Sequence, residues 1–470
     1  MNAFRRLVKS IATILPEVPK PTRKPSFKEK LMWVGIVLIV YLTMAQVPLY
    51  GVATGGQDPL AFSRVIFASQ RGTLMELGIG PIVTAGLILQ LLKGSEIIKL
   101  DFKKPEDRAL FSSATKILTL IVILVEASAF IFSGIYGQNL TLQTMAIILT
   151  QLFIVGIIVI LLDELIQKGW GLGSGVSLFI MAGVAQQVLW NIFSIIPTGE
   201  GPLGIIPFII DSAIRGTWDL VLFRPNNLPS LFGLMITIVV IIIIIYVEGI
   251  RIEIPITSTK YRGFQGTYPI KLLYVSNIPV ILVSALTANF MFWAQMTWSR
   301  FNSDNSNSIL NFFATYNTTD TSGGPTGGLM YYISSPGTIG TTMQDPLRAI
   351  GYILFFVVLS ILFARIWVEI GGLSPKDVAK NLLGADVQVR GFRRSGASVQ
   401  AILERYIPVI TILGGAFIGI LASVSDILGT FGSGIGLLLM TSITLQYYQT
   451  LMKEQLETQA PALASLLGKS

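Results

Sequence analysis

Ten long runs of apolar residues restrict the folds that this chain can adopt. A helix needs roughly 20 mostly apolar residues to cross a bilayer, and each run approaches or meets that length. Five consecutive isoleucines at 241–245 lack the two-residue alternation of a membrane β-barrel strand. The sequence therefore predicts an all-α, polytopic membrane protein of ten transmembrane helices. The predicted spans are 31–50, 77–92, 117–137, 139–162, 172–196, 229–247, 272–295, 349–368, 406–425 and 428–452.

The basic residues orient these spans, because cytoplasmic loops of membrane proteins carry an excess of Lys and Arg. An even number of spans places both termini on one side, and that side holds 27 of the 34 Lys and Arg residues. The opposite side holds six, and Arg365 lies within a span. We therefore expect a multi-pass protein of the cell (plasma) membrane with both termini in the cytoplasm. The basic, proline-containing N-terminus is not expected to be a cleavable signal peptide.

The composition excludes most covalent chemistry. The chain has no Cys and no His, so disulfides, thiol nucleophiles, thiolate metal sites and imidazole acid–base catalysis are ruled out. Its glycine-rich runs are not followed by the Gly-Lys-Ser/Thr of a phosphate-binding loop. We therefore expect a protein that is not an enzyme and binds no cofactor and no metal. Any energy for its work must come from a partner.

Glycine interrupts spans in both halves of the chain. The second span opens with Gly78-Ile79-Gly80-Pro81, the fifth opens with GLGSGV at 171–176, and the tenth contains GSGIG at 432–436. Such interruptions indicate inverted repeats and a site near the bilayer midplane. Close helix packing through small residues is the alternative.

Aliphatic residues recur at helical spacing beside these glycines. Ile79 and Val83 share one helix face, and Val176 and Ile180 repeat the same four-residue spacing. A narrow ring of aliphatic side chains would form a deformable seal that binds no ion, whereas a polar solute pathway would place charges or carbonyls at its constriction. Contact with lipid or with a neighbouring helix is the alternative for each residue.

Polar residues inside predicted spans are functional candidates, most strongly when they are ionisable. Hydrogen bonds between them are worth about 0.6–2 kcal/mol each, so a cluster of them could form a contact that opens. A static contact between helices is the alternative. The candidates are Thr84, Gln90, Glu126, Asn277 and Asn289.

An external connection is longer than a helix bundle needs. Within it, Asp58 and Pro59 are typical of a helix start, and residues 58–70 predict a short helix. This helix would either dip into the membrane inside the protein or lie on the external surface.

Two long cytoplasmic loops carry basic residues at their tips. The loop 248–271 predicts a strand with a tight turn at Gly263 and Gly266. The loop 370–405 predicts a short helix that ends at Gly384, followed by a basic tip. Basic tips suit a polyanionic partner such as ribosomal RNA or an acidic protein surface. Attraction to lipid headgroups is the alternative.

Four segments resemble signature sequences of the SecY family, the large (alpha) subunit of the protein-conducting translocation channel. The resemblance extends over nearly the whole chain and keeps the order of all ten spans. The run Val47-Pro48-Leu49-Tyr50-Gly51 is similar to the archaeal/eukaryotic type. The four segments are 78–92, 171–180, 275–279 and 391–408.

The resemblance implies roles for individual residues. The pore ring would consist of Ile79, Val83, Val176, Ile180, Leu439 and either Ile278 or Ile281. The plug would include Pro59, Leu60, Ala61, Phe62, Ser63, Arg64, Val65, Ile66 and Phe67. The lateral gate would lie between spans 2–3 and spans 7–8, with polar contacts at Thr84, Gln90, Glu126, Asn277 and Asn289. Docking of a partner to the cytoplasmic loops would use Lys260, Arg262, Arg393 and Arg394.

The resemblance also implies two pseudo-symmetric, inverted halves around a central pore. A cytoplasmic segment, 1–30, would precede the first half, 31–200. The second half, 201–452, would precede a cytoplasmic tail, 453–470. The implied partners are translocating polypeptides and signal sequences, small single-span subunits of the gamma (SecE) and beta types, the ribosome and membrane lipid.

These features predict a passive, gated channel that moves unfolded polypeptides across the membrane and releases hydrophobic segments sideways into lipid. A secondary transporter that uses Glu126 or Arg365 for coupling is a rival hypothesis, and it requires a compact binding pocket at the midplane. A membrane scaffold that only recruits partners is a third hypothesis, which leaves the plug-like segment unexplained.

Overall fold

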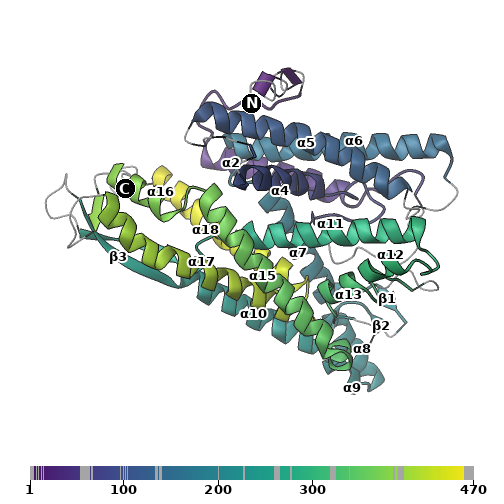
Figure 1. Ribbon diagram of the computed structural model, residues 1–470. Helices are drawn as coiled ribbons and strands as arrows, with labels where there is room; N and C mark the ends of the chain where they lie inside the picture. The colour runs from purple at the N-terminus through teal and green to yellow at the C-terminus, as the bar shows by residue number, and fades with distance from the viewer. Residues whose placement is uncertain are drawn as a thin grey trace.

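The structure is a computed structural model of residues 1–470, and it is mainly helical (Figure 1). The structure describes the whole chain except for a set of short segments. These are residues 1–4, 7, 9, 12, 14, 53–63, 65–66, 96, 99, 101, 103, 133–135, 137–139, 200, 226–227, 259–264, 276–277, 318–323, 338, 385–386, 390–395 and 460–470.

A helix lies over each of the ten predicted spans. Seven helices of the described residues are long and apolar enough to cross a membrane, and α4 is a shorter apolar helix. The all-α membrane fold predicted from the sequence is therefore confirmed. The ten helices are α2 (Phe27–Met44), α4 (Gly80–Gly94), α5 (Pro105–Phe132), α6 (Leu142–Leu165), α7 (Gly175–Phe193), α10 (Leu231–Gly249), α11 (Ile278–Phe301), α15 (Pro346–Ile370), α17 (Gly396–Ile427) and α18 (Gly434–Gln459).

Local signals explain where several of these helices begin. Ser26 and Glu29 form a capping box at the start of α2, in which each side chain bonds the other residue's backbone N–H. Helix α5 begins at Pro105, twelve residues before the predicted span, and carries Glu106 and Asp107 in its first turn. Proline and acidic residues both favour a helix N-terminus. Helix α5 therefore extends beyond its apolar segment.

Shorter elements occupy the connections. On the predicted external side these are β1 (Pro197–Thr198), β2 (Gly201–Pro202), α8 (Ile205–Arg215), α9 (Asp219–Leu222), α12 (Ser308–Phe313), α13 (Leu329–Ile333) and α14 (Ile339–Gln344). On the predicted cytoplasmic side they are η1 (Ile166–Trp170), β3 (Arg251–Ser258), β4 (Gln265–Lys271), α16 (Pro375–Gly384) and β5 (Val387–Val389).

A three-stranded antiparallel sheet, in the order β4–β3–β5, joins the two long cytoplasmic loops. The predicted strand is present as β3, and the helix predicted to end at Gly384 is α16. The turn predicted at Gly263 and Gly266 is wrong at Gly266, which lies in β4 and pairs with Ile256 of β3, and Gly263 lies outside the described residues. Burial raises the pKa of the Tyr268 hydroxyl, so this residue of β4 stays neutral.

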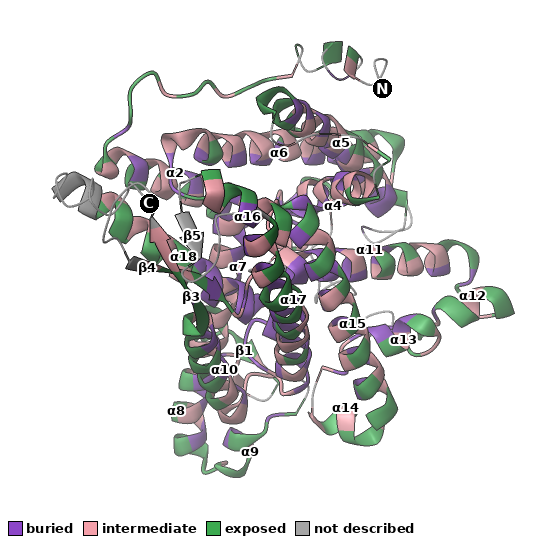
Figure 2. Ribbon diagram, turned by 60° about the vertical axis from the view of Figure 1, so that its left-hand side comes forward, coloured by how far each residue is buried: buried purple, intermediate pink, exposed green. Residues whose placement is uncertain are grey.

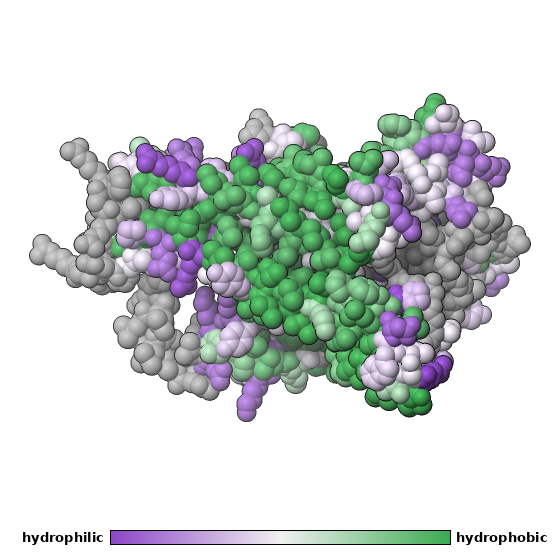
Figure 3. Space-filling view, turned by 90° about the horizontal axis from the view of Figure 1, so that it is seen from below, coloured by the Kyte–Doolittle hydropathy of each residue, from purple (hydrophilic) through white to green (hydrophobic). Residues whose placement is uncertain are grey.

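The helices form two groups with a shared core. Figure 1 shows α2, α4, α5 and α6 together on one side and α10, α15, α17 and α18 on the other. Buried segments concentrate where the helices meet, and exposed segments lie on their outer faces and at their ends (Figure 2). Hydrophobic side chains cover a broad central area of the face in Figure 3, with hydrophilic side chains at both ends. This distribution suits a surface surrounded by lipid.

Candidate functional site

The predicted ring residues lie in one apolar cluster at the centre of the protein. Each of these residues belongs to the largest hydrophobic cluster or packs against it. They come from α7, α11, α18 and the start of α4, so four separate segments contribute to the cluster. Four of the residues are buried, namely Ile79, Val83, Ile180 and Leu439, and three are partly buried, namely Val176, Ile278 and Ile281.

The start of α4 is built on a close backbone approach. Gly78 has a φ of +55°, which favours glycine. A Cβ atom there would lie 2.2 Å from the carbonyl oxygen of Phe67, so no other residue fits without a shift. The N–H of Ile79 donates to that same oxygen at 2.8 Å. The glycine that precedes the second span therefore docks the end of the predicted plug onto the first ring residue.

Two further helices hold the end of the predicted plug. The Tyr41 hydroxyl of α2 donates to the carbonyl oxygen of Ala68 at 3.1 Å. The ring of Tyr41 stacks on Phe179 of α7, with centroids 4.9 Å apart. A Cβ atom on Gly183 of α7 would lie 3.5 Å from the Cβ of Ala68. Of the predicted plug residues, Arg64 and Phe67 are described, and Pro59, Leu60, Ala61, Phe62, Ser63, Val65 and Ile66 lie outside the described residues.

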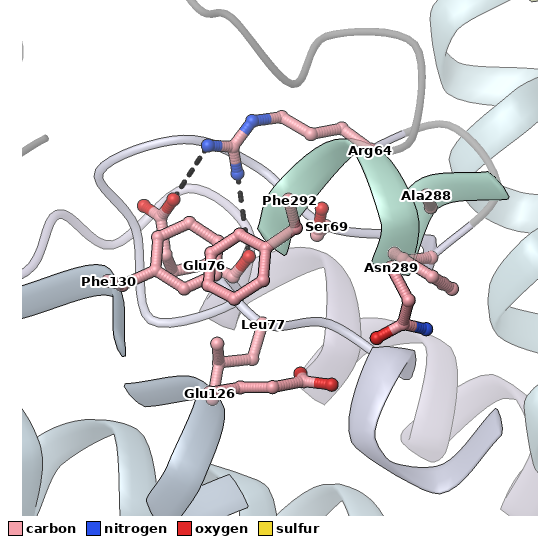
Figure 4. A pocket seen from close by; sticks show the side chains of 10 residues that line it. Arg64, Ser69, Glu76, Leu77, Glu126, Phe130, Ala288, Asn289 and Phe292 are labelled. Atoms are coloured by element: carbon pink, nitrogen blue, oxygen red, sulfur yellow. Dashed lines mark hydrogen bonds and ion pairs between the residues drawn. The ribbon is translucent and has the colours of Figure 1, made fainter. Parts of the chain in front are cut away.

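A buried ion pair joins the predicted plug to the segment before α4. The Arg64 Nη2 atom lies 2.7 Å from Glu76 Oε1 (Figure 4). The side chain of Glu76 is fully buried, and its other oxygen accepts from the N–H of Gly72. Sequence reasoning did not single out Glu76. An acidic residue next to an apolar span was the available signal, because buried charges require partners.

Three of the predicted gate residues form one hydrogen-bonded group. Thr84 of α4 donates to Glu126 Oε1 of α5 at 3.3 Å, and Asn289 of α11 donates to the Thr84 hydroxyl at 3.1 Å. Figure 4 shows Glu126 and Asn289 beside the same pocket. Asn277 lies outside the described residues. Gln90 lies further along α4, and its Oε1 atom is buried without a hydrogen-bond partner among the described residues.

Two further contacts close the same interface, one on each side of these polar residues along the helices. Phe130 of α5 stacks on Phe292 of α11, with ring centroids 4.8 Å apart. Lys93, in the last turn of α4, donates to the carbonyl oxygen of Ile370 at the end of α15 at 3.1 Å. Helix α4 therefore contacts both α11 and α15, and α5 contacts α11 through Phe130. The interface predicted to form a lateral gate is closed in this structure.

The cavity beside these polar residues is small. It has a volume of about 30 Å³ and includes Arg64, Glu76, Glu126 and Asn289 in its lining. That is room for one or two water molecules, far below the roughly 300–1,000 Å³ of small-molecule sites. Arg365 is exposed on α15 and does not line this cavity. Among the described residues, the cavity at Glu126 is therefore much smaller than the midplane pocket that a secondary transporter requires.

The predicted docking residues Lys260, Arg262, Arg393 and Arg394 all lie outside the described residues. The sheet that connects their loops is described. In it, β3 pairs with β5 through Ile256 and Val389. No group of three or more acidic residues that could hold a metal ion occurs among the described residues.

The fold and the site define a class: a multi-pass helical membrane protein with an aliphatic centre, a plug-like segment against it and a polar contact in its side wall. Comparisons with known proteins agree. The SecY family profile matches residues 73–448, and the profile of the plug domain of Sec61p matches residues 39–72.

The chain is similar to the protein transport protein Sec61 subunit alpha of Dictyostelium discoideum, with 41% identity covering 97% of each chain. A solved structure described as that of a protein conducting channel has a TM-score of 0.82 and 36% identity, covering 97% of this chain and 98% of the other. Sec61 from the canine ribosome-channel complex of the endoplasmic reticulum has a TM-score of 0.79 and 37% identity, with the same coverage. The chain therefore belongs to the SecY family, and these relatives are transport proteins.

Proposed function

We propose that this chain is the central subunit of a passive, gated channel that moves unfolded polypeptides across the membrane and releases hydrophobic segments sideways into lipid. One observation carries this proposal: aliphatic residues from α7, α11, α18 and the start of α4 meet in a single central cluster. Aliphatic side chains seal against ions without offering a binding site. They also let any side chain slide past, because they form no specific contact with it.

The plug closes the pore from the external side. Its described end is held by the Arg64–Glu76 ion pair, the Phe67–Ile79 backbone bond and the Tyr41 hydroxyl. Each of these contacts is local and can be exchanged for water when the plug leaves. The plug therefore stabilises the closed state and can still be displaced.

A hydrophobic signal segment opens the side wall between α4–α5 and α11–α15. It replaces the contacts of Thr84, Glu126 and Asn289 with its own apolar surface. Burial of that surface is worth about 25 cal/mol per Å² relative to water. The polar contact contributes about 0.6–2 kcal/mol per hydrogen bond, so a segment of ordinary length outweighs it.

A ribosome or another polyanionic partner docks on the two cytoplasmic loops. The β4–β3–β5 sheet makes these loops one unit, so Lys260 and Arg262 act together with Arg393 and Arg394. Small single-span subunits complete the complex. The partner supplies the energy for transport, and the subunit itself is not an enzyme and needs no cofactor.

The protein lies in the cell membrane with both termini in the cytoplasm, a proposal that the asymmetry of its basic residues supports. The first half, 31–200, and the second half, 201–452, are inverted repeats, preceded and followed by the cytoplasmic segments 1–30 and 453–470. The two halves move apart at the side wall during opening.

Reconstitution of the full chain with its partners in sealed vesicles tests the function. A chain that bears a signal sequence should become protected from external protease, whereas the same chain with a charged residue in the signal should not. A compact solute that crosses faster than the signal-bearing chain would favour the secondary transporter instead. Recruitment of partners without passage of any chain would favour the scaffold.

A further inference from the structure

The last two helices of each predicted half are joined in the same way. A Gly-Ser-Gly sequence leads into α7 at residues 173–175 and into α18 at residues 432–434, and its second glycine is the first helical residue in both cases. Its first glycine has a positive φ in both cases, +74° at Gly173 and +80° at Gly432. The two connections therefore share their sequence and the conformation of their first glycine, although Ser174 is extended and Ser433 has a φ of +62°.

A buried aspartate at the end of the preceding helix caps each of these helices. Asp163 Oδ1 accepts the N–H of Val176 at 2.9 Å, and Asp426 Oδ1 accepts the N–H of Gly434 at 2.6 Å. The two aspartates are 8% and 7% exposed. Carboxylates stabilise a helix N-terminus by satisfying free N–H groups and by complementing the helix dipole.

The second oxygen of each aspartate is also bonded. Asp163 Oδ2 accepts from the Gln167 side chain at 2.7 Å, and Asp426 Oδ2 accepts from the Tyr352 hydroxyl of α15 at 2.6 Å. Complete bonding offsets the cost of burying a carboxylate. Tyr352 also ties the cap of α18 to α15, one of the helices at the side wall.

The close approach of the helices leaves no room for adjustment. A Cβ atom on Gly175 would lie 2.5 Å from the Cα of Asp163, and one on Gly434 would lie 2.3 Å from the carbonyl oxygen of Ala422. A larger residue at either glycine would force the capped helix to shift. Each capped helix therefore starts at a fixed height beside its neighbour.

The height at which each helix starts fixes the positions of its ring residues. Ile180 and Leu439 each lie five residues after the second glycine of the Gly-Ser-Gly sequence. The same register pairs Val176 with Ile435, which is fully buried in the central cluster. We propose that Asp163 and Asp426 are positioning residues of the channel, each setting the height at which its capped helix presents aliphatic side chains to the pore ring. This inference rests on the proposed function, because it takes these side chains to form the seal.

The resting ion conductance of the reconstituted full chain tests the proposal. Asp163→Ala and Asp426→Ala should each raise the conductance about tenfold or more. Loss of the hydrogen bonds of a charged cap changes the equilibrium constant between the sealed and the shifted helix by about that factor. Asp163→Asn and Asp426→Asn should restore the seal, because the amide oxygen still accepts the helix N–H. Ser423→Ala is the matched control, since Ser423 is buried on α17 and bonds only within its own helix.

Alanine variants that fold, as judged by their thermal unfolding, and conduct no more than the wild type would overturn the proposal. If Asp426→Ala fails to fold, Tyr352→Phe decides, because it removes one hydroxyl and keeps the ring. If Asp163→Ala fails to fold, Gln167→Met decides in the same way, because it removes the side-chain donor to Asp163. A raised conductance in Tyr352→Phe supports the proposal, and the wild-type value overturns it. Failure of the proposed function would look different, since wild-type vesicles would then transport no signal-bearing chain.

Discussion

Asn289 of α11 donates a hydrogen bond of 3.1 Å to Thr84 of α4, although the two residues are 205 positions apart in the sequence. The Thr84 hydroxyl in turn donates a hydrogen bond to Glu126 of α5. The three side chains thus connect helices on the two sides of the proposed lateral gate. Any sideways opening between α4 and α11 must break the bond between Asn289 and Thr84.

Loss of this contact should favour the open gate. Asn289→Leu removes the bond, and the ratio of closed to open channels should fall by a factor of about 3–30, as expected for one interhelical hydrogen bond. Cysteines at Gly94 and Ile370 report closure, because a Cβ on Gly94 would lie 3.1 Å from the Ile370 side chain. The chain has no native Cys, so their disulfide is the only one that can form.

The rate of this crosslink should therefore fall in Asn289→Leu. Thr297→Val serves as the control, since Thr297 is partly exposed on the same helix and its hydroxyl donates to the carbonyl oxygen of Trp293. An unchanged crosslinking rate in Asn289→Leu would show that the polar contact does not hold the gate closed.

A disulfide should lock the end of the plug. Ala68→Cys with Gly183→Cys places two Cβ atoms about 3.5 Å apart, within the range of disulfides. Oxidation should stop transport of a signal-bearing chain, and a reductant should restore it, because the plug can then leave again. Each single cysteine variant is the control. Continued transport by the crosslinked protein would show that residue 68 need not move.

Glycine at four ring positions should break the seal. The variant carries Ile79→Gly, Val83→Gly, Val176→Gly and Ile180→Gly, and it should leak ions through the resting channel in a planar bilayer. The control carries glycine at Ile238, Val239, Ile242 and Ile245, which are exposed on α10. Each set replaces four β-branched residues by glycine, which lowers helix propensity in both, so a leak in the ring variant alone separates the seal from that weakening. Equal conductance in the two variants would refute the assignment of these four residues to the pore ring.

The ion pair between Arg64 and Glu76 should matter for stability. Glu76→Ala should lower the free energy of unfolding in detergent by about 3–5 kcal/mol, because it leaves a buried guanidinium without its carboxylate. The double variant Arg64→Ala with Glu76→Ala should lose less than the sum of the single losses. Asp211→Ala is the control, since its partner Arg215 is exposed and such pairs contribute about 0.3–0.5 kcal/mol. Additive losses would mean that the pair is not coupled.

Charge reversal at the cytoplasmic loops should weaken docking. Arg262→Glu and Arg393→Glu should each reduce ribosome binding to the vesicles, most strongly at low salt, because salt screens the attraction between basic residues and a polyanion. Lys453→Glu changes the same charge at the exposed end of α18 and should have little effect. If ribosome binding did not change in Arg262→Glu or Arg393→Glu, these loops would not be the docking site.

The helices and the family could be predicted from the sequence because both depend on local information. Apolar runs of about 20 residues predict spans wherever they occur, and a helix lies over each run. The boundaries were less predictable. The α5 helix continues to Pro105 beyond the apolar segment, and α18 begins only at Gly434, after a turn with positive φ at Gly432.

Contacts between distant segments could not be predicted in the same way. Nothing local indicates that Ile256 pairs with Val389, which makes one sheet of two loops. Asp163 and Asp426 look like ordinary charges at the ends of spans, and only the structure shows that each caps the next helix. Likewise, only the structure shows that Glu76 forms a buried ion pair with Arg64.

The sequence by itself determined the membrane fold, the number and order of the apolar segments and the aliphatic character of the ring positions. These properties depend on the transfer of side chains between water and lipid, which each segment undergoes largely on its own. The tertiary structure decided which side chains meet, including Thr84 with Asn289 and Tyr352 with Asp426. Such meetings depend on the packing of whole helices, which one interhelical hydrogen bond is too weak to dictate.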